Sequence, residues 1–215
     1  MNRREAFKRL GFGMGALIVT PSVISLLQSC QSEPDFTPVF LGPEDGKSLL
    51  KIVGLIIPSD QQIPGAKELG IYTFVDAYWK QMLPEKEQNF VRVGFTALNN
   101  TFTAMFGKEM HLGTLEEFDQ LLTKYLKSSK EQQIEYNVKI GEYMEAVLKD
   151  SSAQLDRDSA TFAMLSGIRG LTIRGWKLHE EIGKNVLWYN PIPGEYQGCI
   201  PADEAGNGYI MTLES

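Results

Sequence analysis

The 215-residue chain has few residues that bind metals. It contains two cysteines, Cys30 and Cys199, and two histidines, His111 and His179. An iron–sulfur cluster held by this chain alone would need about four thiolates, and multi-histidine zinc sites need more imidazoles than the chain has. These two classes of metal protein are therefore excluded. If Cys30 is modified, Cys199 stands alone and no internal disulfide can form.

Nucleotide-binding motifs and an excess of positive charge are also missing. The sequence has neither a GxGxxG nor a GxxxxGK[ST] pattern, so it contains no recognisable phosphate-binding loop for a nucleotide. Residues 1–29 hold four basic residues and one acidic residue, and the remainder has 17 basic and 26 acidic residues, a formal charge of −9. Nucleic-acid binding requires a basic surface, so we expect no nucleic-acid partner.

The N-terminus has the features of an export signal. Asn2 to Lys8 fits the twin-arginine pattern, with the pair Arg3 and Arg4 followed by Phe7 and Lys8. The apolar run 10–27 that follows contains three glycines and is only moderately hydrophobic, as in leaders of this class. We therefore interpret residues 1–29 as a twin-arginine signal peptide. The pathway carries folded proteins, which suggests a loaded enzyme, yet the chain shows no cofactor motif.

The leader ends in Leu27-Gln28-Ser29-Cys30, which resembles a lipoprotein cleavage site. This pattern predicts that Cys30 becomes the mature N-terminus and carries lipid, so the protein would be exported and lipid-anchored on the periplasmic side of a membrane. An uncleaved membrane anchor is the alternative. Pro21, the serines and the glycines in the apolar run argue against such a permanent span.

The rest of the chain predicts an all-α fold, an irregular bundle of about six helices followed by a long extended tail rich in Pro, Gly and aromatic residues. The expected organisation is a tether at 30–46, a helical domain at 47–190 and an interface tail at 191–215. The expected helices are 47–57, 71–82, 84–106, 114–127, 129–149 and a last helix from Asp156 or Asp158 through Ile173. Thr114 and Glu117 form a predicted capping box.

Apolar residues recur at three- and four-residue steps along two of these segments. The sets are Phe90, Val93, Ala97, Leu98, Phe102 and Met105 in 84–106, and Ile134, Val138, Tyr143 and Val147 in 129–149. We expect each set to form the apolar face of its helix.

Isolated polar residues give only weak evidence for a catalytic or metal-binding site. His179 in WKLHEEIG lacks the second histidine of an HExxH motif, and we interpret it as a surface histidine. Asp60 and Asp76 could be paired acids, although the Asp in PSD is more typical of a residue that caps a turn. Cys199 has no basic residue nearby in the sequence to lower its pKa, so it is expected to be non-catalytic.

The C-terminal segment combines aromatic side chains with a Pro-rich backbone. Such aromatic residues should not be bare in water. They either cover the helices of the chain itself or contact another protein, and the residues alone do not choose between the two. The expected partner-interface set is Trp176, Trp188, Tyr189, Pro191, Pro193, Tyr196 and Cys199.

Two stretches resemble a known family. IIPSDQQIPGAKELGIYTFVDAYW (56–79) resembles the N-terminal signature of the gluconate 2-dehydrogenase subunit 3 family, and GLTIRGWKLHEEIGKNVLWYNPIPGEYQGCIP (170–201) resembles its C-terminal signature. We refer to them as the N-terminal and C-terminal signatures. The middle, 84–149, is similar only in its helical character. The positions that match the family's pattern and are expected to be structural are Pro58, Asp60, Pro64, Gly65, Gly70 and Asp76.

The resemblance implies a small helical subunit without catalytic residues, metal or cofactor of its own. It implies a flavin-dependent large subunit of the glucose–methanol–choline type as partner, which holds FAD, oxidises sugars or sugar acids, and passes electrons to a cytochrome c or a quinone. That partner would travel through the twin-arginine machinery on this chain's leader. The alternative is a membrane-tethered exported binding lipoprotein, or a thiol protein, that acts alone.

Overall fold

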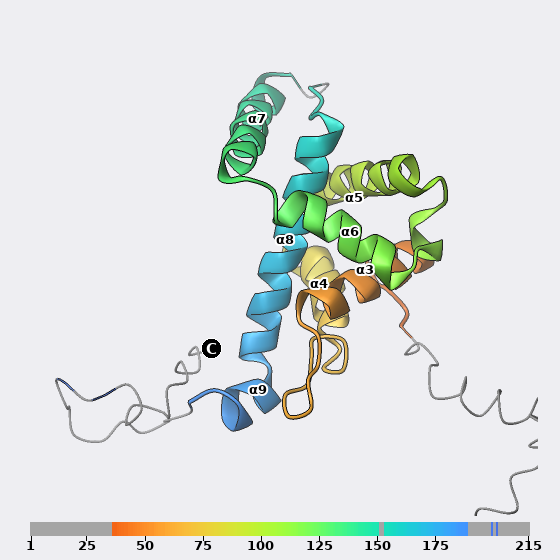
Figure 1. The fold of residues 1–215 in the computed structure, drawn as a ribbon. Coiled ribbons are helices and arrows are strands. Elements are labelled where there is room, and N and C mark those ends of the chain that lie inside the picture. The colour runs from red at the N-terminus through yellow and green to blue at the C-terminus, as the bar shows by residue number, and fades with distance from the viewer. Residues whose placement is uncertain (1–35, 151–152, 189–198, 200, 202–215) are drawn as a thin grey trace, which may run out of the picture. The chain divides into compact units, whose positions relative to one another are not determined.

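The structure is a computed structural model that describes residues 36–150, 153–188, 199 and 201. Within these residues the fold is all-α, as predicted, and no strand is present. The elements, shown in Figure 1, are α3 (Pro43–Ile56), α4 (Ile71–Gln81), α5 (Glu85–Phe106), the 3-10 turn η1 (Met110–Leu112), α6 (Leu115–Leu126), α7 (Lys130–Lys149), α8 (Arg157–Leu178) and α9 (Glu180–Asn185).

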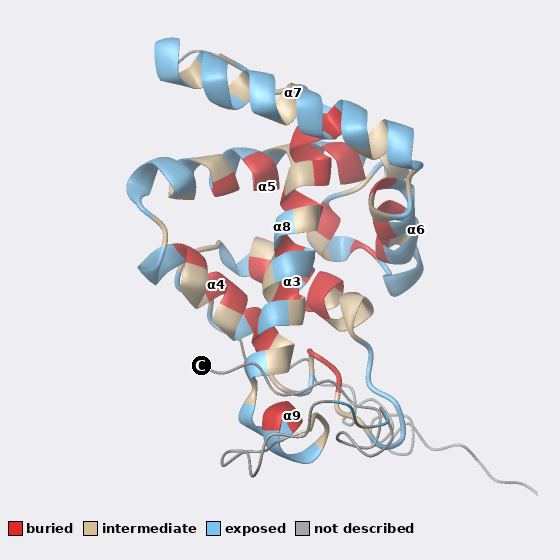
Figure 2. Cartoon of the chain, turned by 90° about the vertical axis from the view of Figure 1, so that its left-hand side faces the viewer, coloured by how far each residue is buried: buried red, intermediate tan, exposed pale blue. Residues whose placement is uncertain are grey.

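Helix α8 is the centre of the domain, because α3, α4, α5, α6, α7 and α9 all pack against it (Figure 1). Phe162, Leu165 and Ile168 are buried along it, and Figure 2 shows buried residues in red along α8. A helix that is covered on several sides must be apolar on more than one face. This requirement explains why α8 has no clean polar stripe.

Glycines let two helices approach α8 closely. A Cβ at Gly175 of α8 would lie 2.6 Å from Phe74 Cδ1 of α4, and a Cβ at Gly94 of α5 would lie 2.9 Å from Met164 Sδ of α8. Neither position has room for a larger side chain. The largest fully buried side chains of the described residues include Tyr125, Phe102, Phe118, Leu49, Ile52, Leu98 and Met110.

Local capping signals place the helix starts where the sequence predicted them. The capping box at Thr114 and Glu117 is present at the start of α6, Ser129 accepts a hydrogen bond from the Gln132 N–H at α7, and Asp156 accepts one from the Ser159 N–H at α8. These side chains satisfy backbone donors that the first turn leaves unpaired. Such bonds join residues three apart, so sequence is sufficient to predict them.

Two helix ends differ from the prediction by several residues, and two short elements were not predicted. Helix α3 begins at Pro43 instead of Lys47, because proline is well suited to the first turn of a helix. Helix α8 continues past Ile173 to Leu178, and both α4 and α9 pack against α8. The short α9 and η1 were not predicted, since each is too short to show a period in the sequence.

The predicted apolar faces of α5 and α7 were partly wrong. Val93, Ile134 and Val138 are exposed by 40%, 63% and 53%. The residues that face the core are Val91, Phe95, Leu98 and Phe102 in α5 and Tyr136 in α7. Both helices have apolar residues on two sides, so the period alone could not identify the side that packs on α8.

Several residues of the predicted export signal, lipid-attachment site and partner interface lie outside the described part of the chain. These are Arg3, Arg4, Phe7, Lys8, Cys30, Tyr189, Pro191, Pro193 and Tyr196. Among the helices that the structure describes, none has both the length and the apolar character needed to cross a membrane.

Candidate functional site: the junction of the two signature segments

The N-terminal signature begins with a turn that Asp60 organises. The Asp60 carboxylate accepts hydrogen bonds from the N–H groups of Gln62 (2.8 Å) and Ile63 (2.7 Å). These bonds hold the pKa of Asp60 below its ordinary value. Aspartate typically uses this geometry to form a turn, which confirms the turn-capping interpretation. Pro58, which precedes the turn, is exposed at the end of α3.

Gly65 and Gly70 serve two different backbone requirements. Gly65 is buried, and a Cβ there would lie 2.7 Å from the Ile57 carbonyl oxygen and would also meet the Ser59 nitrogen. Only glycine fits where two backbone segments approach this closely. Gly70 has φ 66° in the left-handed region and immediately precedes α4. Both glycines therefore meet a requirement of the backbone in this loop.

Asp76 fixes the segment that leads into α3. It is buried in α4, and its carboxylate accepts hydrogen bonds from the N–H groups of Val39 (2.6 Å), Phe40 (3.2 Å) and Leu41 (2.9 Å). Three donors on one carboxylate compensate for its loss of water. Asp76 therefore belongs to a structural anchor inside the expected tether. The sequence analysis left open that Asp60 and Asp76 are paired acids, and the structure shows each carboxylate bonded to backbone N–H groups instead.

The C-terminal signature meets this loop through Trp176. Its indole Nε1–H donates a 3.0 Å hydrogen bond to the Pro64 carbonyl oxygen, between residues 112 positions apart in the chain. The adjacent Gly175 packs on Phe74 of the N-terminal signature. We call the contacts of Trp176 with Pro64 and of Gly175 with Phe74 the signature junction. Trp176 is half-buried, so the hydrogen bond secures one edge of a ring that is still partly accessible.

His179 caps the short helix α9, which follows the signature junction in the sequence. His179 ends α8 and begins α9, where its Nδ1 accepts a 3.2 Å hydrogen bond from the Glu181 N–H. This structural role explains a histidine that the sequence analysis left without function. Trp188 is half-buried, and Cys199 carries a free, exposed thiol.

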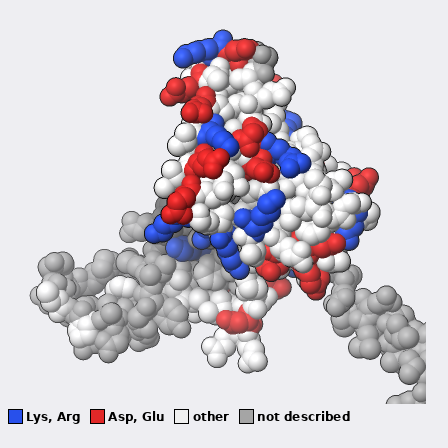
Figure 3. Space-filling view, turned by 45° about the horizontal axis from the view of Figure 1, so that its top comes forward, with Lys and Arg blue, Asp and Glu red and all other residues white. Residues whose placement is uncertain are grey.

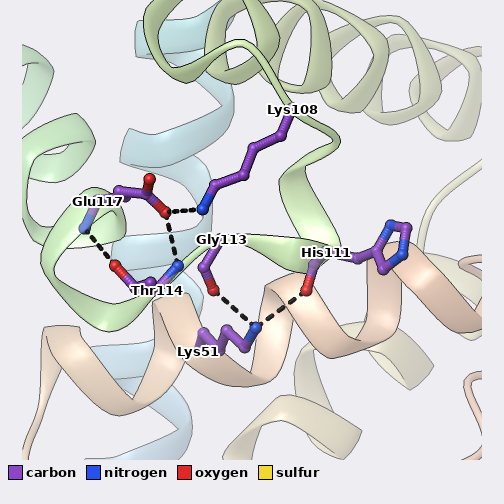
Figure 4. Close-up of polar contacts among 6 residues, drawn as sticks. All are labelled: Lys51, Lys108, His111, Gly113, Thr114 and Glu117. Carbon is purple, nitrogen blue, oxygen red and sulfur yellow. Dashed lines mark hydrogen bonds and ion pairs between the residues drawn. The ribbon is translucent and has the colours of Figure 1, made fainter.

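A second polar cluster, which sequence analysis missed, joins α3 to η1 and α6 (Figure 4). Lys51 of α3 donates to the carbonyl oxygens of His111 (3.0 Å) and Gly113 (2.9 Å). Lys108 pairs with Glu117 at 2.9 Å, and this contact and the Thr114 N–H lower the pKa of Glu117. Lys51 carries no local signal, because its partners lie 60 and 62 positions further along the chain.

One group of possible metal ligands lies beside this cluster. Ligand atoms of Glu44, Glu109 and His111 lie within 4.8 Å of one another. The His111 Nδ1 atom is 3.5 Å from Glu109 and 3.9 Å from Glu44, and both carboxylates are more than 70% exposed. Exposed carboxylates beside an imidazole form a weak surface ion pair when the histidine is protonated. This contact supplies no enclosed place for a reaction.

The described surface shows mixed charge. Figure 3 shows acidic and basic side chains side by side on the face that it presents. The side chains of Asp60, Asp76 and Trp176 are hydrogen-bonded to backbone atoms, and such bonds hold loops in place. The geometry therefore supports a scaffold that presents a surface, with the C-terminal signature held against the N-terminal one.

The comparison with protein families gives a match that includes most of this scaffold. The family model for gluconate 2-dehydrogenase subunit 3 matches residues 43–194. No curated protein and no solved structure matches the chain. The match includes the signature junction and all seven α-helices that the structure describes, and it extends over more than half of the sequence. The chain therefore belongs to the gluconate 2-dehydrogenase subunit 3 family.

Proposed function

We propose that this chain is the non-catalytic accessory subunit of a flavin-dependent dehydrogenase complex. The observation that carries the proposal is the family match over residues 43–194, because the family is named for a subunit of a dehydrogenase. In this proposal the catalytic large subunit is of the glucose–methanol–choline type, binds FAD, and oxidises a sugar or sugar acid. A cytochrome c accepts the electrons.

The second part of the proposal is export of that large subunit. The sequence begins with a twin-arginine pattern at Arg3 and Arg4, and the pathway read by such a pattern carries folded proteins. A small chain without a cofactor motif has little need of that pathway for itself. A partner that folds around FAD in the cytoplasm does need it. The small subunit then binds, stabilises and carries the large one, and lipid on Cys30 holds the complex on the periplasmic side of a membrane.

The C-terminal segment is the proposed contact with the large subunit. Trp188, which follows α9, is half-buried, and aromatic anchors are typical of binding interfaces. The signature junction supports this assignment, because it fixes the position from which the segment starts. Trp176, Tyr189, Pro191, Pro193, Tyr196 and Cys199 complete the proposed interface.

The experiment is cell fractionation with antibodies to both subunits. Arg3→Lys combined with Arg4→Lys preserves charge but removes the guanidinium pair, and we expect both subunits to stay in the cytoplasm. Arg9→Lys, a basic residue of the leader outside the pair, is the matched control and should leave export unchanged. Normal export of the flavoprotein in the double variant would contradict the carrier role.

A truncation after Asn190 separates binding from export. The truncated chain retains its leader and the described helices. If the tail contacts the large subunit, the small subunit should be exported alone and the flavoprotein should remain behind. Export of both chains at normal levels would contradict the proposed interface.

A further inference from the structure

Helix α7 has apolar residues on two sides. One side faces the domain, where Tyr136 stacks on Phe162 of α8 at 5.0 Å and Tyr143 lies 6.1 Å from Phe90 of α5. The other side has a second set of large apolar residues in contact with water. They are Ile134, Val138, Met144 and Leu148, with exposed fractions of 63%, 53%, 48% and 81%. Figures 1 and 2 show α7 at the edge of the domain, where no described element covers this outer side.

The exposed set is symmetrical about a glycine. Ile134 and Val138 precede Gly141 by seven and three residues, and Met144 and Leu148 follow it by three and seven. Steps of three, four and seven place side chains on one face of a helix. We call Ile134, Val138, Gly141, Met144 and Leu148 the α7 stripe.

The packing of this chain does not explain Gly141. A Cβ built there meets no atom within 4 Å, in contrast to Gly94 and Gly175, where a Cβ would contact a neighbouring helix. Glycine within a helix is less stable than alanine. Its presence at the centre of the stripe is explained if another backbone approaches the helix there.

We propose that the α7 stripe is the interface of a homodimer, in which α7 packs antiparallel against α7 of a second copy across a two-fold axis at Gly141. The axis brings each Ile134 opposite Leu148 of the second copy. The two Val138 side chains then lie along one edge of the contact and the two Met144 side chains along the other. The two glycines meet at the crossing and let the helices approach closely. A two-fold interface uses the same patch on both chains, and the symmetrical spacing of the stripe provides one.

The charges at the edge of the stripe agree with this arrangement. Glu131 and Lys149 are 18 residues apart, which is about five turns of 3.6 residues, so both lie on the same edge of the helix. The two-fold axis brings Glu131 to within about two residues, or roughly 3 Å along the helix, of Lys149 of the second copy. The pair forms twice. Asn137 and Glu145, four residues before and after Gly141, lie within the stripe and not at its edge. The same operation brings Glu145 to the level of Asn137 of the second copy, whose amide has two N–H donors.

The interface is small. Helix α7 has 20 residues and is therefore about 30 Å long, whereas stable interfaces bury about 800 Å² on each partner. A single helix pair buries less, so the dimer should depend on concentration. This association goes beyond the proposed accessory function and does not depend on it.

The first test measures the mass of the purified full chain by analytical ultracentrifugation over a range of concentrations. Ile134→Lys alone and Leu148→Glu alone should each weaken dimerisation at least tenfold. The double variant should regain it, because each introduced lysine then faces an introduced glutamate of the second copy. Met82→Glu, which changes an exposed methionine outside α7, is the matched control and should dimerise normally.

The second test uses a cysteine on the proposed axis. In a chain with Cys30→Ser and Cys199→Ser, Gly141→Cys should form a disulfide-linked dimer under mild oxidation, because the two Cα atoms meet within the range that a disulfide spans. Gly167→Cys is the control, since Gly167 is another exposed helical glycine with open space around it.

A chain that is monomeric at every concentration, or Gly141→Cys that cross-links no faster than Gly167→Cys, would overturn the proposal. A monomeric chain that loses the large subunit when the stripe is substituted would assign this face to that subunit, and would also overturn the homodimer. Neither result affects the proposed accessory function.

Discussion

The Trp176 indole donates a 3.0 Å hydrogen bond to the Pro64 carbonyl oxygen and so joins the two signatures of the chain. Pro64 lies in the loop between α3 and α4, and Trp176 lies near the end of α8. This bond therefore helps to hold the C-terminal end of α8 against the N-terminal signature.

Trp176→Phe should destabilise the domain by about 1 kcal/mol, the typical contribution of one hydrogen bond. Phenylalanine retains most of the ring contact but lacks the N–H. Urea unfolding followed by circular dichroism measures the change. Trp188→Phe, which leaves the bond between residues 64 and 176 in place, is the control. An unchanged free energy of unfolding for Trp176→Phe would show that the bond contributes little.

Asp76→Asn should lower the free energy of unfolding by about 2–4 kcal/mol, which is more than the change expected for Trp176→Phe. The reason is that a buried amide replaces a charged acceptor of three backbone N–H groups. Hydrogen exchange should show faster exchange of the Val39, Phe40 and Leu41 amides. Asp60→Asn is the comparison, since Asp60 accepts its bonds at an exposed turn. Equal protection of residues 39–41 in both variants would contradict the anchoring role.

Gly65→Ala and Gly170→Ala should have opposite effects. A Cβ at Gly65 would meet the backbone of Ile57 and Ser59, whereas a Cβ at Gly170 would meet no atom within 4 Å. We expect Gly65→Ala to cost about 1–3 kcal/mol and Gly170→Ala to stabilise α8 by about 0.5–1 kcal/mol. Thermal unfolding of the two variants provides the comparison. A stabilised Gly65→Ala variant would show that the loop has more room than the structure indicates.

We expect the domain to lose stability at alkaline pH because of Tyr125. Its side chain is fully buried and donates a 2.8 Å hydrogen bond to Asp158 Oδ1. Burial first, and then the carboxylate, raise its pKa above the ordinary value of 10.0. The folded state therefore binds this proton more tightly than the unfolded state. The stabilising effect is complete below pH 10 and falls as pH rises towards the raised pKa.

The matching variant is Tyr125→Phe, whose free energy of unfolding should decrease less between pH 9 and pH 11 than that of the wild type. Burial also raises the pKa of Tyr72 and Tyr136, so a smaller slope should remain. Tyr143→Phe, at a half-buried position, is the control. Parallel pH profiles for wild type and Tyr125→Phe would contradict the assignment.

Cys30→Ala should abolish incorporation of a labelled fatty acid, because the predicted lipid is attached through the Cys30 sulfur. Cys199→Ser is the matched control and should be labelled like the wild type. Metabolic labelling followed by immunoprecipitation measures both. Equal labelling of Cys30→Ala and wild type would contradict a lipoprotein.

The sequence by itself determined the features that depend on neighbouring residues. The caps at Thr114, Ser129 and Asp156 and the turn at Asp60 each join residues two or three apart, so their chemistry is readable in a short window. The all-α class followed from apolar periodicity, and the two signatures indicated the family.

Only the tertiary structure decided which partners distant residues meet. The bonds from Trp176 to Pro64, from Lys51 to the η1 region, and from residues 39–41 to Asp76 depend on how α8, α3 and α4 pack. The side of α7 that packs on the domain could not be identified from the sequence either. Ile134 and Tyr136 are both apolar and two positions apart, yet only Tyr136 is buried, because α8 can cover one side of α7 and leaves the other free.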